Sequence, residues 1–81
     1  MKNPRLNKII AKRICQLRTK QGLSIEKLAY QSGISKGGLS EIERNKKQPT
    51  ILTVLKICAG LKITMSEFFD FEEIEYFLTE L

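Results

Sequence analysis

The sequence predicts an all-α fold. Apolar residues recur at spacings of three and four, as on one face of a helix, in successive segments of the 81-residue chain. Three of these segments are preceded by residues that favour the start of a helix, Ser24, Ser35 and Thr50. Gly22 and Gly33 stand where helices would end. A chain of this length forms one domain at most, so we expect one small helical domain.

The first helix is predicted over residues 6–20. Its buried stripe consists of Ile10, Ile14 and Leu17, which lie four and three residues apart. Basic side chains lie mostly off this stripe. Gly22 ends the helix.

Two short helices with a tight connection follow, over residues 24–32 and 35–43. Gly33 can adopt the left-handed conformation that ends the first of them without a steric penalty. The residues expected to face the core are Leu28, Ala29, Leu39 and Ile42. Two capped helices joined by a three-residue turn form the pattern of a helix-turn-helix, whose second helix usually enters the major groove of DNA.

A fourth helix is predicted over residues 51–60, capped by Thr50 and ended by Gly60. Its apolar face is expected to comprise Leu52, Leu55 and Ala59, and to extend towards Ile51 and Cys58. A fifth helix is expected to begin at Ser66 and Glu67 and to run through Phe68 and Phe69.

We divide the chain into a DNA-binding domain, residues 1–70, and a tail, residues 71–81, whose apolar spacing is also helical. The apolar residues around the tail are Phe68, Phe69, Phe71, Ile74, Phe77, Leu78 and Leu81. They offer more apolar surface than a short last helix needs, which favours a symmetric homodimer contact. The alternative is that the tail folds back and completes its own core.

Charge is distributed unevenly along the chain, whose net charge is +5. Residues 1–65 contain all 14 basic side chains and three acidic ones, which gives +11. Residues 66–81 contain six acidic side chains and no basic one, which gives −6. Residues 1–65, the basic body of the chain, indicate a polyanionic partner. The acidic tail is expected to lie away from that partner.

Several function classes are excluded at this point. Cys15 and Cys58 lie far apart beside apolar residues, so we expect two buried thiols rather than a disulfide. The chain has no histidine and no close cysteine pair, so no metal and no cofactor are expected. We find no nucleophile–base pair and no phosphate-binding loop, which argues against an enzyme.

The same composition bears on location and ligands. The chain has no long apolar run that would span a membrane, and its basic beginning lacks the apolar core of a signal peptide. We therefore expect a cytoplasmic protein. We expect no small-molecule effector domain.

Residues 22–50, GLSIEKLAYQSGISKGGLSEIERNKKQPT, resemble the phage repressor/Cro-type helix-turn-helix family, also called the xenobiotic-response-element family. The matching motifs are Gly22-Leu23-Ser24, Leu28-Ala29, Ile42-Glu43-Arg44-Asn45 and Pro49. Leu52, Leu55, Ala59, Leu61, Phe68 and Phe69 match the family's later helices, so that the resemblance covers about residues 6–70. It implies a compact five-helix, lambda-repressor-like domain that binds double-stranded DNA.

The resemblance and the residue chemistry together give candidate DNA contacts. By position, Ser35, Lys36, Gly37 and Glu41 match the family's base-facing or backbone-contacting sites. Lysine can donate to guanine or to a phosphate, and glutamate can accept from the cytosine amino group. The complete set of candidates is Ser24, Lys27, Ser35, Lys36, Gly37, Gly38, Ser40, Glu41, Arg44, Asn45, Lys46 and Lys47.

Two departures from the family pattern concern the DNA-facing side. Ile25 replaces the family's usual glutamine at the start of the second helix. In the family this glutamine contributes to a phosphate contact, so in this chain that contact is lost or replaced. Gly37 and Gly38 cannot read bases through side chains, and each costs up to about 1 kcal/mol relative to alanine in a helix. Either they let the backbone approach DNA closely, or packing merely tolerates them. Specificity would then depend partly on DNA shape.

The family also pairs an arginine at the end of the first helix with a glutamate at the end of the recognition helix. In this sequence these residues are Arg18 and Glu43. We predict a partly buried ion pair that fixes one helix against the other.

The sequence thus predicts a sequence-specific transcriptional regulator that acts as a homodimer on a palindromic operator. Small restriction-modification controller proteins, phage repressors and antitoxins all fit this description, and repression is not separated from activation. The alternative is a protein-interaction module that keeps the fold but reads DNA weakly. Ile25, Gly37 and Gly38 favour that alternative, and the basic body opposes it.

Overall fold

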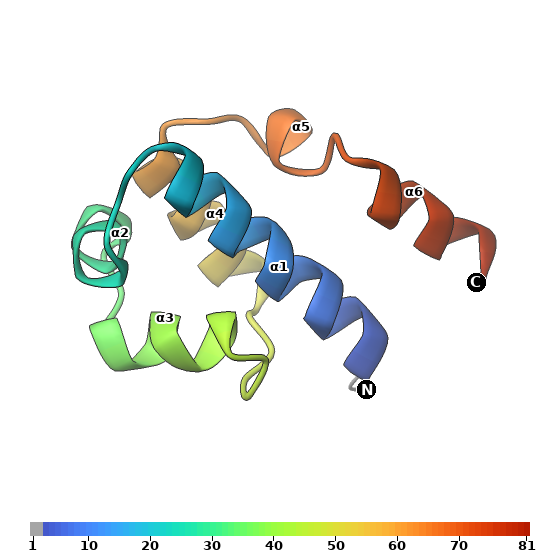
Figure 1. Ribbon diagram of the computed structural model, residues 1–81, viewed down its shortest axis with the longest axis horizontal. Helices are drawn as coiled ribbons and strands as arrows, with labels where there is room; N and C mark the ends of the chain where they lie inside the picture. The colour runs from blue at the N-terminus through green and yellow to red at the C-terminus, as the bar shows by residue number, and fades with distance from the viewer. Residues whose placement is uncertain (1–2) are drawn as a thin grey trace.

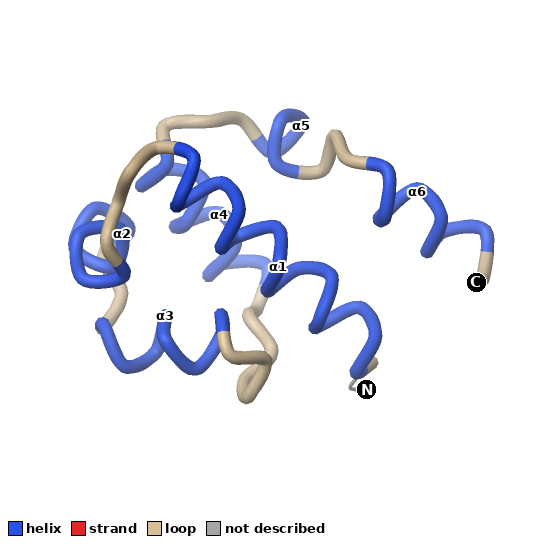
Figure 2. Tube along the Cα trace, viewed as in Figure 1, coloured by secondary structure: helices blue, strands red, loops and turns tan. Residues whose placement is uncertain are grey.

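A computed structural model describes residues 3–81 (Figure 1). These residues form helices joined by short loops and contain no strand, as Figure 2 shows, so the predicted all-α fold is confirmed. Residues 1 and 2, which we assigned to the DNA-binding domain, lie outside the described part. The helices are α1 (Pro4–Lys20), α2 (Ile25–Ser32), α3 (Lys36–Glu43), α4 (Ile51–Leu61), α5 (Met65–Phe68) and α6 (Glu72–Thr79).

Helix α1 begins two residues before its predicted start. The side chain of Asn3 accepts a hydrogen bond from the backbone N–H of Leu6 at 3.0 Å, and Pro4 occupies the first turn. Asparagine caps and first-turn proline both favour a helix start. Ile10 and Ile14 are buried as predicted, and Leu17 is half-buried.

The helix-turn-helix forms as predicted. Helix α2 starts after its cap Ser24 and ends at Gly33, whose φ is 68°. Helix α3 starts after its cap Ser35, and Asn45 beyond it is left-handed with φ 59°. The predicted core residues Leu28, Ala29, Leu39 and Ile42 are all buried.

The predicted buried face of α4 is wrong except for Cys58, which is buried as expected. Leu52 and Leu55 are 60% and 45% exposed, and Ile51 is 70% exposed. The residues that face the core are Val54, Ile57, Cys58 and Leu61. Both sets have helical spacing, since the helix ILTVLKICAGL is apolar on two sides, and spacing alone does not choose between them.

The predicted end of α4 is also wrong. Gly60 lies inside the helix, which continues to Leu61 and ends at the left-handed Lys62. A Cβ added to Gly60 would lie 2.1 Å from the side-chain oxygen of Ser32 on α2. The glycine is therefore required for the close approach of two helices and not for a turn.

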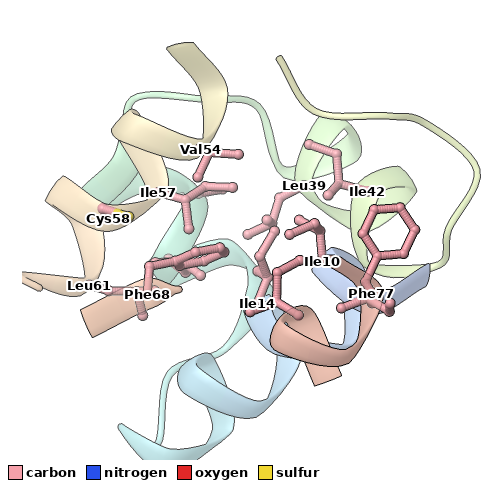
Figure 3. Close-up of a cluster of buried hydrophobic side chains, with 14 residues drawn as sticks. Ile10, Ile14, Leu39, Ile42, Val54, Ile57, Cys58, Leu61, Phe68 and Phe77 are labelled. Atoms are coloured by element: carbon pink, nitrogen blue, oxygen red, sulfur yellow. The ribbon is translucent and has the colours of Figure 1, made fainter. Parts of the chain in front are cut away.

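The last two helices complete the core. Helix α5 starts earlier than predicted, because Thr64 and Glu67 form a reciprocal capping box. The tail is helical, as predicted, in α6. Phe68, Ile74 and Phe77 are buried among side chains of the core (Figure 3).

This packing corrects the predicted dimer surface. Phe68, Ile74 and Phe77 are 0%, 9% and 7% exposed and so serve the core of their own chain. Phe69 and Phe71 are half-buried against the same core. Leu78 and Leu81 remain exposed. The alternative that the tail folds back therefore holds for its buried residues.

Charged contacts also attach the tail to α1. Arg5 pairs with Glu80 at 2.7 Å, and Lys12 pairs with Glu73 at 3.4 Å. Arg13 donates to the backbone oxygens of Phe68 and Glu67 at the end of α5. The acidic helix α6 thus lies along α1, far from α3 (Figure 1).

Candidate nucleic-acid interface

The serine caps position the two helices of the helix-turn-helix. The side-chain oxygen of Ser24 accepts from the backbone N–H of Lys27 at 3.0 Å, and that of Ser35 accepts from Gly38 at 2.9 Å. Each hydroxyl then still has its own hydrogen to donate. Both serines are exposed, so each can donate to an anion.

Helix α3 has one buried and one open side. Leu39 and Ile42 point into the core between α1 and α4 (Figure 3). Lys36, Gly37 and Glu41 are exposed, and Gly38 and Ser40 are half-buried. The core contacts therefore present the predicted base-reading residues to solvent. We call Lys36, Gly37, Ser40 and Glu41 the reading surface.

The loop after α3 carries the strongest positive charge near this surface. Its exposed residues include Arg44, Asn45, Lys46 and Lys47. The left-handed Asn45 turns the chain, and the backbone N–H of Lys46 donates to the backbone oxygen of Glu41 at 2.8 Å. This hydrogen bond fixes the loop to the end of α3.

The ion pairs within residues 3–81 involve only basic side chains of α1. Arg5, Lys12 and Arg18 are paired with carboxylates, two of them on the acidic tail. Within residues 3–81, no ion pair forms at the basic side chains near the helix-turn-helix, Lys27, Lys36, Arg44, Lys46 and Lys47. Their charge remains available to an external anion.

Two shallow hollows connect the loop with neighbouring elements. Lys47 and Gln48 line one hollow together with Ser35 and Gly38 at the start of α3. They line another with Asn7 of α1. Sequence reasoning missed Gln48 and Asn7. Gln48 adjoins the basic residues in sequence, whereas the position of Asn7 depends on how α1 packs.

The predicted Arg18–Glu43 ion pair is present. The guanidinium Nε lies 2.7 Å from Oε2 of Glu43, and Nη2 lies 3.0 Å from Oε1. The side chains are 14% and 6% exposed, so the pair is largely buried. A further hydrogen bond runs from Arg18 to the backbone oxygen of Leu23 at 2.7 Å. The hydrogen bonds that Arg18 donates to Glu43 raise the pKa of Arg18 above its ordinary value, although burial acts against this rise.

The cysteines take no part in this face. Both are free thiols, with Cys58 buried and Cys15 half-buried. Burial raises the pKa of the Cys58 thiol. In the described range 3–81, no group of three or more His, Cys, Asp or Glu residues could hold a metal ion. None of the helices described is long and apolar enough to cross a membrane.

Comparison with known proteins agrees with this geometry. A family model described as "Helix-turn-helix" matches residues 14–68, more than half of the chain. The chain belongs to the helix-turn-helix family. The buried residues Leu28, Leu39 and Ile42 and the reading surface all lie inside the matched range.

Several members of the helix-turn-helix family are similar in sequence. The HTH-type transcriptional regulator SutR of Escherichia coli (strain K12) is 40% identical over 63 residues, which cover 78% of this chain and 35% of SutR. YgzD of Bacillus subtilis (strain 168), an uncharacterized HTH-type transcriptional regulator, is 33% identical over 61 residues, covering 75% of this chain and 92% of YgzD. The chain spans 31–40% of the length of SutR, SlrR and PuuR.

Solved structures of two restriction-modification controller proteins are similar as well. Wild-type C.Esp1396I matches with a TM-score of 0.78 and 32% identity, over 80% of this chain and 83% of that chain. C.AhdI from Aeromonas hydrophila matches with a TM-score of 0.73 and 32% identity, over 78% and 96%. The resemblance predicted from the sequence is thereby confirmed.

Proposed function

We propose that the protein is a sequence-specific DNA-binding transcriptional regulator that acts in the cytoplasm as a homodimer on a palindromic operator. One observation carries this proposal: the open side of α3 lies beside a basic loop whose charges have no ion-pair partner within residues 3–81. Helix α3 would enter the major groove, as the second helix of this motif usually does. The names of the relatives support a regulatory role.

The reading surface would supply the base contacts. Lys36 can donate to guanine O6 and N7, and Glu41 can accept from the cytosine amino group. Ser40 can donate or accept. The direct readout of each half-site is therefore narrow, and DNA shape would contribute to specificity.

The surrounding residues would contact the DNA backbone. Phosphate contacts fix the register of a protein on the duplex and supply most of the affinity. The candidates are Ser24, Lys27, Ser35, Arg44, Asn45, Lys46 and Lys47, to which we add Asn7 and Gln48. The Arg18–Glu43 pair would hold α3 against α1 at the angle that DNA entry requires.

The dimer contact is proposed on α4 rather than on the tail alone. Ile51, Leu52 and Leu55 form an exposed apolar ridge on this helix, which we call the α4 ridge. An apolar hollow adjoins the ridge, lined among others by Leu6, Ile51 and Phe69. A twofold contact requires one patch that complements itself. A ridge and a hollow on the same face meet this requirement, because each copy can insert its ridge into the other's hollow.

A twofold dimer would present two α3 helices to one side of the DNA. The half-sites would then lie about one helical turn, roughly 34 Å, apart on a palindrome. Exposed Leu78 and Leu81 at the end of the tail are the remaining candidates for a contribution to the contact.

Selection from a random pool of duplex DNA at low salt, followed by affinity measurement at several salt concentrations, tests the proposal. We expect enriched palindromes and an affinity that falls steeply with salt, because binding releases about 0.9 counterions per neutralised phosphate. Replacing Lys46 and Lys47 with alanine should make this dependence shallower. No enrichment at low salt would reject the proposal and favour a protein-interaction module.

A further inference from the structure

The two adjacent glycines of α3 differ in what surrounds them. A Cβ added to Gly38 would lie 2.9 Å from the side-chain oxygen of Ser35, which caps the helix. The cap therefore accounts for Gly38. A Cβ added to Gly37 would meet no atom within 4 Å, and the backbone there is ordinary helix. Within the part of the chain that the structure describes, no neighbouring side chain or backbone requires glycine at this position.

Glycine at position 37 also weakens the helix, since alanine is the better helix former. The residue is exposed at the front of α3. Residues four apart lie on the same face of a helix, so Gly37 and Glu41 share one line along the reading surface. At Gly37, next to Lys36 and Glu41, the reading surface thus has a gap where no side chain projects.

We infer that this gap accommodates the 5-methyl group of a thymine in the major groove. The Cα of glycine offers neither a donor nor an acceptor, so the gap suits an apolar group. Among the base-edge groups of the major groove, the thymine methyl is the apolar one. Gly37 would thus contribute to specificity by leaving space for the methyl group. Its neighbours Lys36 and Glu41 would contribute by hydrogen bonding to bases. The inference rests on the proposed DNA binding.

The test uses the intact chain and a duplex that the wild-type protein enriches from the random pool. Gly37→Ala places a methyl group in the gap, so affinity for this duplex should fall roughly tenfold or more, the size of one mismatched base pair. The thermal unfolding temperature should stay the same or rise. Gly38→Ala, the matched control, should instead lower the unfolding temperature because it crowds the Ser35 cap.

The second arm replaces each thymine of the duplex with uracil, one at a time. At one position in each half-site, uracil should restore the affinity of Gly37→Ala to near the wild-type value, because removal of the thymine methyl makes room for the alanine methyl. Unchanged affinity of Gly37→Ala, or a loss that no uracil restores, would overturn the inference. If the wild-type protein enriched no duplex at all, the proposed function itself would fail.

Discussion

Arg18 joins three parts of the chain through one guanidinium group. It lies near the end of α1, donates to Glu43 at the end of α3, and donates to the backbone oxygen of Leu23 just before α2. These contacts fix α3 in position and involve no residue of the reading surface. Residue types alone would not reveal the pair, because the partners are 25 residues apart. The family resemblance identified it.

Glu43→Gln should strongly destabilise the fold, because it leaves the largely buried Arg18 without its counter-charge. Breaking a buried pair from one side costs about 3–5 kcal/mol, to be measured as the free energy of unfolding in urea. Glu41→Gln on the exposed side of the same helix is the control and should change stability by less than about 0.5 kcal/mol. Equal stability of the two variants would contradict a structural role for the pair.

The stabilisation that the Arg18–Glu43 pair contributes should persist at alkaline pH. The pair's hydrogen bonds raise the pKa of Arg18 above its ordinary value. A raised pKa in the folded state gives stabilisation that is complete below the unfolded value and is lost only as pH rises through the folded value. The contribution of Arg18 is therefore constant throughout the neutral and mildly alkaline range.

At the scale of helices, the crossing of α2 and α4 depends on Gly60. The side-chain oxygen of Ser32, which is buried and has no hydrogen-bond partner within the described chain, faces this glycine. The close approach thus leaves one polar atom unsatisfied, while it allows α2 and α4 to pack directly.

Gly60→Ala should destabilise the protein by about 1–3 kcal/mol, the usual cost of overpacking. Adding Ser32→Ala should restore part of this loss, because it removes the oxygen that lies 2.1 Å from the new Cβ. Recovery should stay incomplete, since the backbone N of Ser32 lies 2.9 Å away. Calorimetric unfolding of the single and double variants measures both effects. A stable Gly60→Ala protein would show that the helices can separate at little cost.

Helix α6 allows a similar test of the tail. Phe77 is 7% exposed and Leu78 is 58% exposed, although the two are neighbours on one helix. Phe77→Ala should cost about 3–5 kcal/mol of unfolding free energy, whereas Leu78→Ala should cost less than about 0.5 kcal/mol. Urea denaturation of the two variants gives the comparison. Similar small losses would mean that the tail is not part of the core.

The sequence was sufficient to predict the helices but not to predict which face of each helix is buried. Caps and glycines are local signals, so the starts of α2, α3 and α4 follow from Ser24, Ser35 and Thr50. The buried face of α4 depends on which neighbours it packs against, and two apolar faces left that choice to tertiary structure. The role of Gly60 was mispredicted for the same reason, since it depends on the contact with Ser32 of α2. The reading surface could be placed because the buried Leu39 and Ile42 determine the opposite side of α3.

At the scale of the whole molecule, the exposed α4 ridge is the main apolar surface outside the core, so association should depend on it. Leu52→Glu should convert the proposed dimer to a monomer in sedimentation equilibrium, because the dimer would have to bury a charge that has no partner. Leu78→Glu is the matched comparison on the tail and should weaken the dimer far less than Leu52→Glu, because the proposed contact centres on α4. Loss of the dimer in Leu78→Glu alone would assign the contact to α6.

The pairing of the tail with α1 has a consequence for the rate of the proposed DNA association. Because Glu73 and Glu80 neutralise Lys12 and Arg5, positive potential is weakened on that side and persists around α3 and its loop. The molecule is therefore an electric dipole whose positive end carries the reading surface. In the field of DNA such a dipole rotates during approach, so that collisions occur preferentially with the correct face forward. The acidic tail, which opposes binding by its charge, would speed productive encounters by its placement.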